Sequence, residues 1–242
     1  MNKKFQYLII FASILSIIIL TLNSIINRRY NFISIILVFL SCLPFYFSYE
    51  NRKPHTREVV VISIMVTLTI ISRILFVLIP GFKPMMAMVI ICGMVFGQEI
   101  GFLCGSLSAF ASNIFFGQGP WTPFQMMALG LIGLVAGILN KNNWLENKVL
   151  LVCYGIICGI GYSLFMDIWT VLSLDQVFNI YRYIAVIVTA IPTMFVYIIS
   201  NVVFLLILVP VLLKRFQRIK LKYGFIDQNY LYEGEGKWRK YY

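Results

Sequence analysis

The sequence predicts an all-α integral membrane protein with about eight transmembrane helices. Of its 242 residues, 60% are hydrophobic and only 12% are charged, which is about half the charged fraction of a typical soluble domain. Mean hydropathy is +0.88, and several apolar runs reach the roughly 20 residues that span a bilayer as a helix. The alternating pattern of an outer-membrane barrel is absent from the sequence, so we expect helical spans.

The first two predicted helices form an N-terminal extension over residues 1–57. The first helix covers about 5–26. Lysines precede it as in a signal peptide, but the apolar run is too long for one and lacks a small-residue cleavage site, so we expect the helix to be retained. The second helix covers about 32–49, and a charged linker at 50–57 separates this pair from the rest.

Six further helices form the predicted core, residues 58–213, and a basic cytoplasmic tail follows at 214–242. Small residues recur every three or four positions, which puts them on one helix face and lets a neighbouring helix approach closely. Pro192 and Pro210 are expected to kink the last helix. The helices are predicted at about 58–79, 85–96, 101–115, 122–139, 149–172 and 183–213, and the small residues are Gly97, Gly101, Gly105, Ala109, Gly130, Gly133, Gly137, Gly155 and Gly159.

The distribution of lysine and arginine predicts a multi-pass membrane protein with both termini in the cytoplasm, and we expect the membrane to be that of a bacterial cell. With the N-terminus inside, the inner segments hold 15 of these residues and the outer segments hold 4. This asymmetry follows the positive-inside rule. It places three loops on the outer face, at residues 80–84, 116–121 and 173–182.

A central loop at residues 115–127 reads Phe-Phe-Gly-Gln-Gly-Pro-Trp-Thr-Pro-Phe-Gln-Met-Met. Its glycines permit unusual backbone angles and its prolines fix φ, so the loop is stiff and shaped. One interpretation is a tight turn with Trp121 as an interfacial anchor. The other, which we favour, is a substrate-facing loop flanked by Gln118 and Gln125, because rigid non-helical backbone at a membrane edge usually lines a cavity.

The sequence argues against several classes of function. The net charge of +11 lies in short segments between the apolar runs and not on a basic face, so no nucleic-acid partner is expected. The five cysteines fall within apolar runs without a Cys-x-x-Cys pair, and His55 is the only histidine, so neither a metal site nor a disulfide framework is predicted. No phosphate-binding loop or nucleophile elbow occurs, so we predict no catalytic residues and no cofactor.

Two charged residues, Arg73 and Asp167, lie within predicted membrane helices. Each is about six residues from the outer end of its helix, which corresponds to a depth of roughly 9 Å. Charges inside a membrane are rare and usually pair or serve function. The two residues are therefore candidates for a structural ion pair, for ligand binding, or for both, with snorkelling a further possibility for Arg73.

A pattern of residues from the third to the sixth predicted helix resembles the substrate-binding S component of an energy-coupling factor (ECF) vitamin transporter, most closely the cobalamin-specific branch. The likeness covers about residues 58–213, and its most specific part is the Gly-Gln-Gly-Pro-Trp-Thr-Pro run. The residues that carry it are Arg73, the Pro-Gly-Phe-Lys-Pro stretch at 80–84, Gly93, Gly97, Gly101, Phe102, Gly105, Asn113, the stretch 117–125 and Gly133.

The resemblance implies a mechanism and partners. S components bind a vitamin at their outer face and topple in the membrane to release it inside, driven by a transmembrane coupling protein and two cytoplasmic ATPases. In the family, an Ala-x-x-x-Ala patch on the first core helix docks the coupling protein. Ser63 and Thr67 are the nearest match here, and neither is an alanine, so the docking residues depart from the family pattern.

The predicted function is therefore the vitamin-binding subunit of an ECF importer, with cobalamin or another corrinoid as the expected ligand, although the aromatic residues would also suit a flavin or a pterin. A membrane-embedded enzyme of lipid or prenyl metabolism and a structural protein without ligand are the alternatives. The predicted substrate-binding residues are Arg73, Phe82, Lys83, Asn113, Gln118, Gly119, Trp121, Gln125, Asp167, Trp169, Tyr181 and Arg182.

Overall fold

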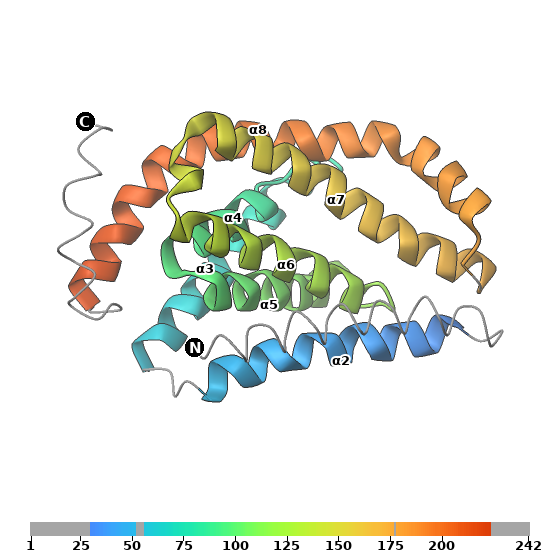
Figure 1. The fold of residues 1–242 in the computed structure, drawn as a ribbon, viewed down its shortest axis with the longest axis horizontal. Coiled ribbons are helices and arrows are strands. Elements are labelled where there is room, and N and C mark those ends of the chain that lie inside the picture. The colour runs from blue at the N-terminus through green and yellow to red at the C-terminus, as the bar shows by residue number, and fades with distance from the viewer. Residues whose placement is uncertain (1–29, 52–55, 177, 224–242) are drawn as a thin grey trace.

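A computed structural model of the chain describes residues 30–51, 56–176 and 178–223, and over these ranges the protein is helical throughout, without a strand (Figure 1). The predicted helix at 5–26 lies outside the described residues. The elements are α2 (Tyr30–Asn51), α3 (Thr56–Leu75), α4 (Met85–Phe96), α5 (Gln98–Phe116), α6 (Thr122–Lys141), the 3-10 turn η1 (Trp144–Glu146), α7 (Lys148–Asp175) and α8 (Ile180–Tyr223).

The described helices have the length and composition of membrane spans. Five of them, α3, α5, α6, α7 and α8, contain a stretch long and apolar enough to cross a bilayer, and α4 is a shorter apolar helix. The outer faces of α3 and α8 expose large apolar side chains, such as Ile64, Leu68, Val188 and Phe195, which suits contact with lipid. The predicted all-α membrane fold is confirmed.

The centre of the bundle is α4 with the α5–α6 hairpin around it. Eleven of the twelve residues of α4 are buried, as expected for a helix that is apolar on every side. Glycines let α5 and α6 meet backbone to backbone. A Cβ added at Gly101 would collide with the carbonyl of Gly133, one at Gly133 would collide with that of Gly101, and one at Gly105 would collide with that of Leu129.

Helix α2 packs against the α5–α6 hairpin, and Figure 1 shows it running along one side of the bundle. The ring of Phe45 stacks on Phe102 with 3.9 Å between centroids. The hydroxyls of Tyr46 and Ser106 form a hydrogen bond of 2.9 Å. These contacts make α2 a packed part of the bundle.

On the opposite side, α7 and α8 pair along their lengths. Gly155 of α7 faces the side chain of Leu205, and Gly159 lies against the backbone of Ile198. Helix α8 contains Pro192 and Pro210, and it arches over the bundle in Figure 1. The bend agrees with the effect expected of a proline, which removes one helical hydrogen bond.

Three details of the predicted elements were wrong. Helix α3 ends at Leu75 and not near residue 79; turns cover 76–79, with the N–H of Val77 bonded to the carbonyl of Ile74. Helix α8 continues to Tyr223 through the segment assigned to a tail. Helix α5 begins at Gln98 and not at residue 101; Gly97, with a φ of +93°, forms the turn between α4 and α5, and its backbone lies against Gly137.

Candidate functional site

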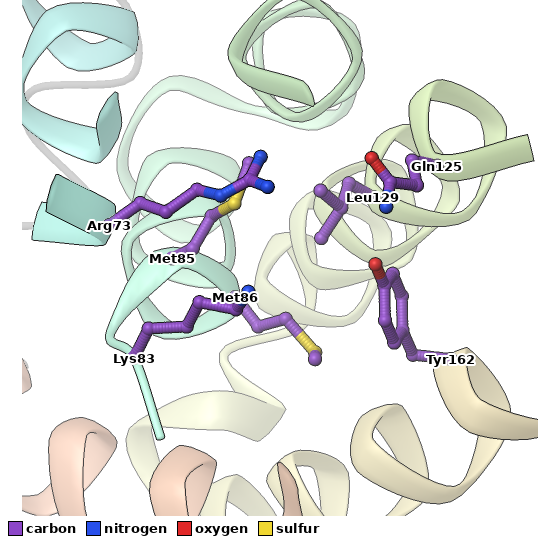
Figure 2. A pocket seen from close by; sticks show the side chains of 7 residues that line it. All are labelled: Arg73, Lys83, Met85, Met86, Gln125, Leu129 and Tyr162. Atoms are coloured by element: carbon purple, nitrogen blue, oxygen red, sulfur yellow. The ribbon is translucent and has the colours of Figure 1, made fainter. Parts of the chain in front are cut away.

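Polar side chains gather at the end of the bundle where α3 and α5 end and α4 and α6 begin. Arg73 lies in the last turn of α3, Lys83 lies just before α4, and Gln125 lies in the first turn of α6. Together with Tyr162 of α7 they line a small pocket. Figure 2 shows Arg73 and Lys83 on one side and Gln125 and Tyr162 on the other. Met85, Met86 and Leu129 complete the lining.

The pocket is small. Its free volume, about 20 Å³ for the centre of a water-sized sphere, is enough for one or two water molecules. Small-molecule sites usually enclose about 300–1,000 Å³. The described pocket is therefore too small for a ligand of that size, which would fit only if the surrounding elements moved apart.

Neutral side chains hold the Arg73 guanidinium in place. Its Nη1 donates hydrogen bonds to Ser112 Oγ and to Asn113 Oδ1, the latter over 2.8 Å. The guanidinium carbon also lies over the Phe116 ring, 4.4 Å from its centroid, which is a cation–π contact. All these partners belong to the last two turns of α5.

Asn113 is the hub of this network. It is only 1% exposed, and its Nδ2 donates to Gln125 Oε1 over 2.8 Å and to Thr122 Oγ1 over 3.1 Å. Because Arg73 also donates to its Oδ1, the amide oxygen and both N–H groups of Asn113 have hydrogen-bond partners. Asn113, predicted as a binding residue, thus positions Arg73 and Gln125 in the described conformation.

The central loop closes back on itself. The side chain of Gln118 donates to the carbonyl of Phe110 over 2.9 Å and accepts from Thr122 Oγ1 over 2.9 Å. The indole of Trp121 lies directly against Gly119, where a Cβ would collide with it. Gly117 has a φ of +100°, a conformation that favours glycine. The loop is a shaped, self-braced turn beside the pocket, and Gln118 and Trp121 do not line that pocket.

The loop at 80–84 is fixed to α8. The backbone N–H of Lys83 donates to Ser200 Oγ over 2.9 Å, and the Ser200 hydroxyl donates back to the Lys83 carbonyl over 3.0 Å. Phe82 packs in a cluster with Phe76 and Phe204. Burial, assisted by the charge of Arg73, lowers the pKa of the Lys83 ammonium to about 8.

The predicted ion pair between Arg73 and Asp167 is wrong. Arg73 is bound to α5, as described above, and Asp167 Oδ2 is buried without a hydrogen-bond partner among the residues the structure describes. Equal depth in a membrane does not fix the direction in which a side chain leaves its helix. Asp167 is 8% exposed, and it is not among the residues that line the pocket.

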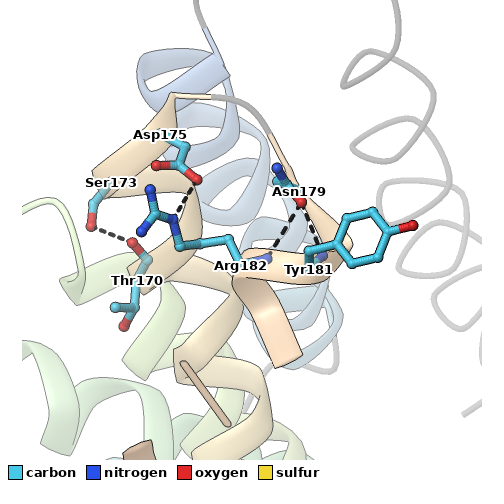
Figure 3. A network of polar contacts seen from close by, with 6 residues as sticks. All are labelled: Thr170, Ser173, Asp175, Asn179, Tyr181 and Arg182. Carbon is cyan, nitrogen blue, oxygen red and sulfur yellow. Dashed lines mark hydrogen bonds and ion pairs between the residues drawn. The ribbon is translucent and has the colours of Figure 1, made fainter. Parts of the chain in front are cut away.

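The remaining predicted residues lie away from the pocket. Trp169 is a core residue, tilted on Phe124 at 5.4 Å between ring centroids. Tyr181 is 82% exposed. Arg182 forms an ion pair of 2.9 Å with Asp175, and Asn179 accepts hydrogen bonds from the first N–H groups of α8 (Figure 3). The third loop is therefore a capped turn braced by a surface ion pair.

Sequence reasoning missed Tyr162, Met85, Met86 and Leu129 as pocket residues. Tyr162 packs edge-on against Tyr197 of α8 at 5.4 Å between ring centroids. With aromatic residues making up 16% of the chain, no sequence signal separates Tyr162 from tyrosines of the core. Met85 could have been predicted as a pocket residue, because it lies only two positions after Lys83, at the start of a helix.

A family model described as "ECF-type riboflavin transporter, S component" matches residues 53–218, which is more than half of the chain and contains every residue of the pocket. The chain belongs to this S-component family. It is a family of transporter components and not of enzymes. The match supports the general resemblance seen in the sequence but does not confirm its cobalamin-specific branch.

Curated relatives of this S component match over shorter stretches. A UPF0397 protein of Vibrio atlanticus (strain LGP32) is 27% identical over 117 residues, 43% of this chain and 63% of the relative. A UPF0397 protein of Aliivibrio fischeri (strain MJ11) is 30% identical over 97 residues, 35% of this chain and 52% of the relative. The chain thus spans between half and two thirds of their length. No solved structure matches the chain.

Proposed function

We propose that this S component is the substrate-binding subunit of an ECF-type importer and that it takes up a vitamin. The observation that supports this most directly is the position of the pocket. Its polar residues come from the helices α3, α6 and α7 and from the loop at 80–84, and α4 adds two methionines to the lining. All of them fall within the stretch that matches the family.

Two vitamins are candidates for the substrate. Riboflavin is supported by the description of the matching family. Cobalamin is supported by the likeness of the 117–125 stretch to the corrinoid branch of S components. Cobalamin is much the larger molecule and requires the wider opening of the small pocket.

We assign direct substrate contacts to Arg73, Lys83 and Gln125, and a positioning role to Asn113. The other predicted residues contact substrate only after the small pocket has opened. The loop at 80–84 is bonded to Ser200 of α8, so in this proposal it opens together with that helix. The central loop is bonded to the ends of α5 and α6 and opens with that hairpin.

The proposed partners are a transmembrane coupling protein and two cytoplasmic ATPases, as in the family. The chain has no phosphate-binding loop of its own. Ser63 and Thr67 are the proposed docking residues: both are exposed on α3, and their hydroxyls bond to carbonyls of the same helix, Val59 and Ser63.

The proposed orientation puts Gln118 outside the cell and Asn142 inside. Single cysteines placed at the two sites should therefore be labelled from opposite sides of the membrane. Labelling of both from the same side would contradict the orientation.

Uptake into vesicles tests the proposed function. The chain is co-expressed with an ECF coupling protein and its ATPases, and radiolabelled riboflavin and cobalamin are supplied outside. The proposal expects uptake of one of them that requires ATP and ceases when the S component is omitted. Uptake that is equal with and without this chain would contradict it.

A further inference from the structure

Two positively charged side chains line the same small pocket, and neither has an acidic partner in the part of the chain that the structure describes. Arg73 and Lys83 are both half-buried, and both extend toward the pocket from one side (Figure 2). Among the described residues, no carboxylate lies within ion-pair distance of either. The Asp175 carboxylate is bound to Arg182, and Asp167 makes no ion pair.

The two cations differ in how far their surroundings satisfy them. Arg73 has neutral hydrogen-bond acceptors and an aromatic face, which stabilise the guanidinium but do not neutralise it. The Lys83 side chain has no hydrogen bond or ion pair within the described part of the chain; only its backbone is bonded, to Ser200. Partial burial removes some of the water around a charge and is costly when no counter-charge replaces it. The lowered pKa of Lys83 agrees with a cation that has no anion beside it.

The start of α4 adds a third positive element. Met85 and Met86, its first two residues, line the pocket. The preceding residue is Pro84, and no side chain caps the helix. The first N–H groups of a helix have no intrahelical partners, and its dipole places partial positive charge at this end, so an uncapped N-terminus favours an anion.

We infer that this side of the pocket is a subsite for an anionic group, a carboxylate or a phosphate, on the transported molecule. Arg73 supplies a fixed fork of donors held by α5, Lys83 supplies a mobile point charge, and α4 supplies backbone donors. The opposite side, formed by Gln125, Leu129 and Tyr162, carries no formal charge at neutral pH and receives the uncharged part of the molecule.

This inference rests on the proposed function and sharpens it. Neutral riboflavin would leave both cations without a counter-charge, whereas riboflavin 5′-phosphate would supply one. Cobalamin carries a phosphodiester, whereas cobinamide lacks that group and the nucleoside attached to it. Pantothenate and pantothenol form a third pair, with and without a carboxylate.

Binding of these matched pairs to the full chain in lipid nanodiscs tests the inference. We expect the member that carries the phosphate or carboxylate to bind, in at least one pair, about tenfold or more tightly than its counterpart without that group, as a charge-assisted hydrogen bond provides. Lys83→Met should abolish the preference. It should also raise the melting temperature of the ligand-free protein, because it removes an uncompensated charge. Lys141→Met, at an exposed lysine in the last turn of α6, is the matched control and should change neither.

The subsite is overturned if the members without a phosphate or carboxylate bind as well as those with one, or if no member with such a group binds. It is also overturned if the preference survives both in a folded Lys83→Met variant and in an Arg73→Lys variant, which keeps the positive charge but loses the planar guanidinium. A neutral vitamin that binds tightly would refute the anion subsite and leave the importer role standing. Binding of an anion without ATP-dependent uptake would refute the importer role alone.

Discussion

At the scale of single residues, Lys83 links the charge of the pocket to pH. Its pKa is lowered from 10.5 to about 8, first by burial and then by Arg73. Because the unfolded chain then holds a proton that the folded chain has lost, stability of the ligand-free protein should rise as pH increases from about 8 to about 10.5. Below pH 8 both states are protonated and the destabilisation by the buried charge is fully present.

Anion binding should show the opposite dependence on pH. An anion stabilises the charged ammonium, so affinity for riboflavin 5′-phosphate should be nearly constant at about pH 7, begin to fall as pH approaches 8, and fall by up to about tenfold per pH unit well above 8. The phosphate itself is a dianion throughout this range. Arg73 stays charged, and Tyr162 is the other titratable side chain of the pocket. Titration calorimetry on the wild type and on Lys83→Met measures this; a profile of equal slope in both would assign the effect to another group.

Trp121 braces the central loop, because its indole lies against Gly119. Trp121→Ala should weaken vitamin binding by about 1–3 kcal/mol, because the loop beside the pocket loses the side chain that braces it. Expression and folding should change little, since Trp121 is 37% exposed. Trp144→Ala, at a 55% exposed tryptophan beyond the other end of α6, is the control. Unchanged affinity in Trp121→Ala would assign Trp121 to the role of an interfacial anchor.

At the scale of elements, the glycine contact between α5 and α6 holds together the two helices whose Asn113 and Gln125 are hydrogen-bonded beside the pocket. Gly133→Ala should lower the free energy of unfolding by about 1–3 kcal/mol, because its Cβ would collide with the carbonyl of Gly101 and force the helices apart. Gly161→Ala is the matched control: it also lies inside a helix, but nothing is within 4 Å of the added Cβ. Equal melting temperatures for the two variants would show that the hairpin tolerates separation.

The exposed face of α3 tests the proposed docking site. Ser63→Leu combined with Thr67→Leu should leave vitamin binding intact and abolish uptake, because bulk on a face of small residues keeps two helix backbones apart. Thr189→Leu, at an exposed threonine of α8 whose hydroxyl also bonds to its own helix, should affect neither. Uptake that survives in the double variant would move the docking surface elsewhere.

Sequence patterns predicted where most helices lie but not how their faces are turned. Helix α4 has the predicted bounds because Pro84 and Gly97 punctuate it. The end of α3 was misplaced because residues 76–79 are as apolar as the helix before them. The extension of α8 was missed because the basic segment after residue 213 was assigned to a tail. Lysine and arginine are good helix formers, so a basic segment does not have to end a helix.

The candidate site shows the same limit. Arg73, Lys83 and Gln125 were predicted because each is a polar residue in an unusual place, and the structure brings all three to one pocket. Asp167 was predicted from depth alone and lies outside it. Depth follows from residue number, whereas contact also requires the rotation of each helix, which packing decides.

At the scale of the whole molecule, a pocket at one end of a membrane bundle that is too small for a vitamin is the feature that the proposed function must explain. A subunit that carries its substrate across a membrane needs a state in which the site is shut. The described pocket holds at most one or two water molecules. Ligand binding therefore requires an open state, and only differential affinity for that state shifts the equilibrium toward it.

Mass spectrometry of the small molecules released from the purified chain tests the central claim most directly. Protein purified from cells grown with a mixture of vitamins should release one vitamin in near-equal molar amount, and that vitamin should carry a carboxylate or a phosphate. The Lys83→Met variant, purified in parallel, should release much less of it. Release of lipid alone from both proteins, with no vitamin retained, would contradict the account.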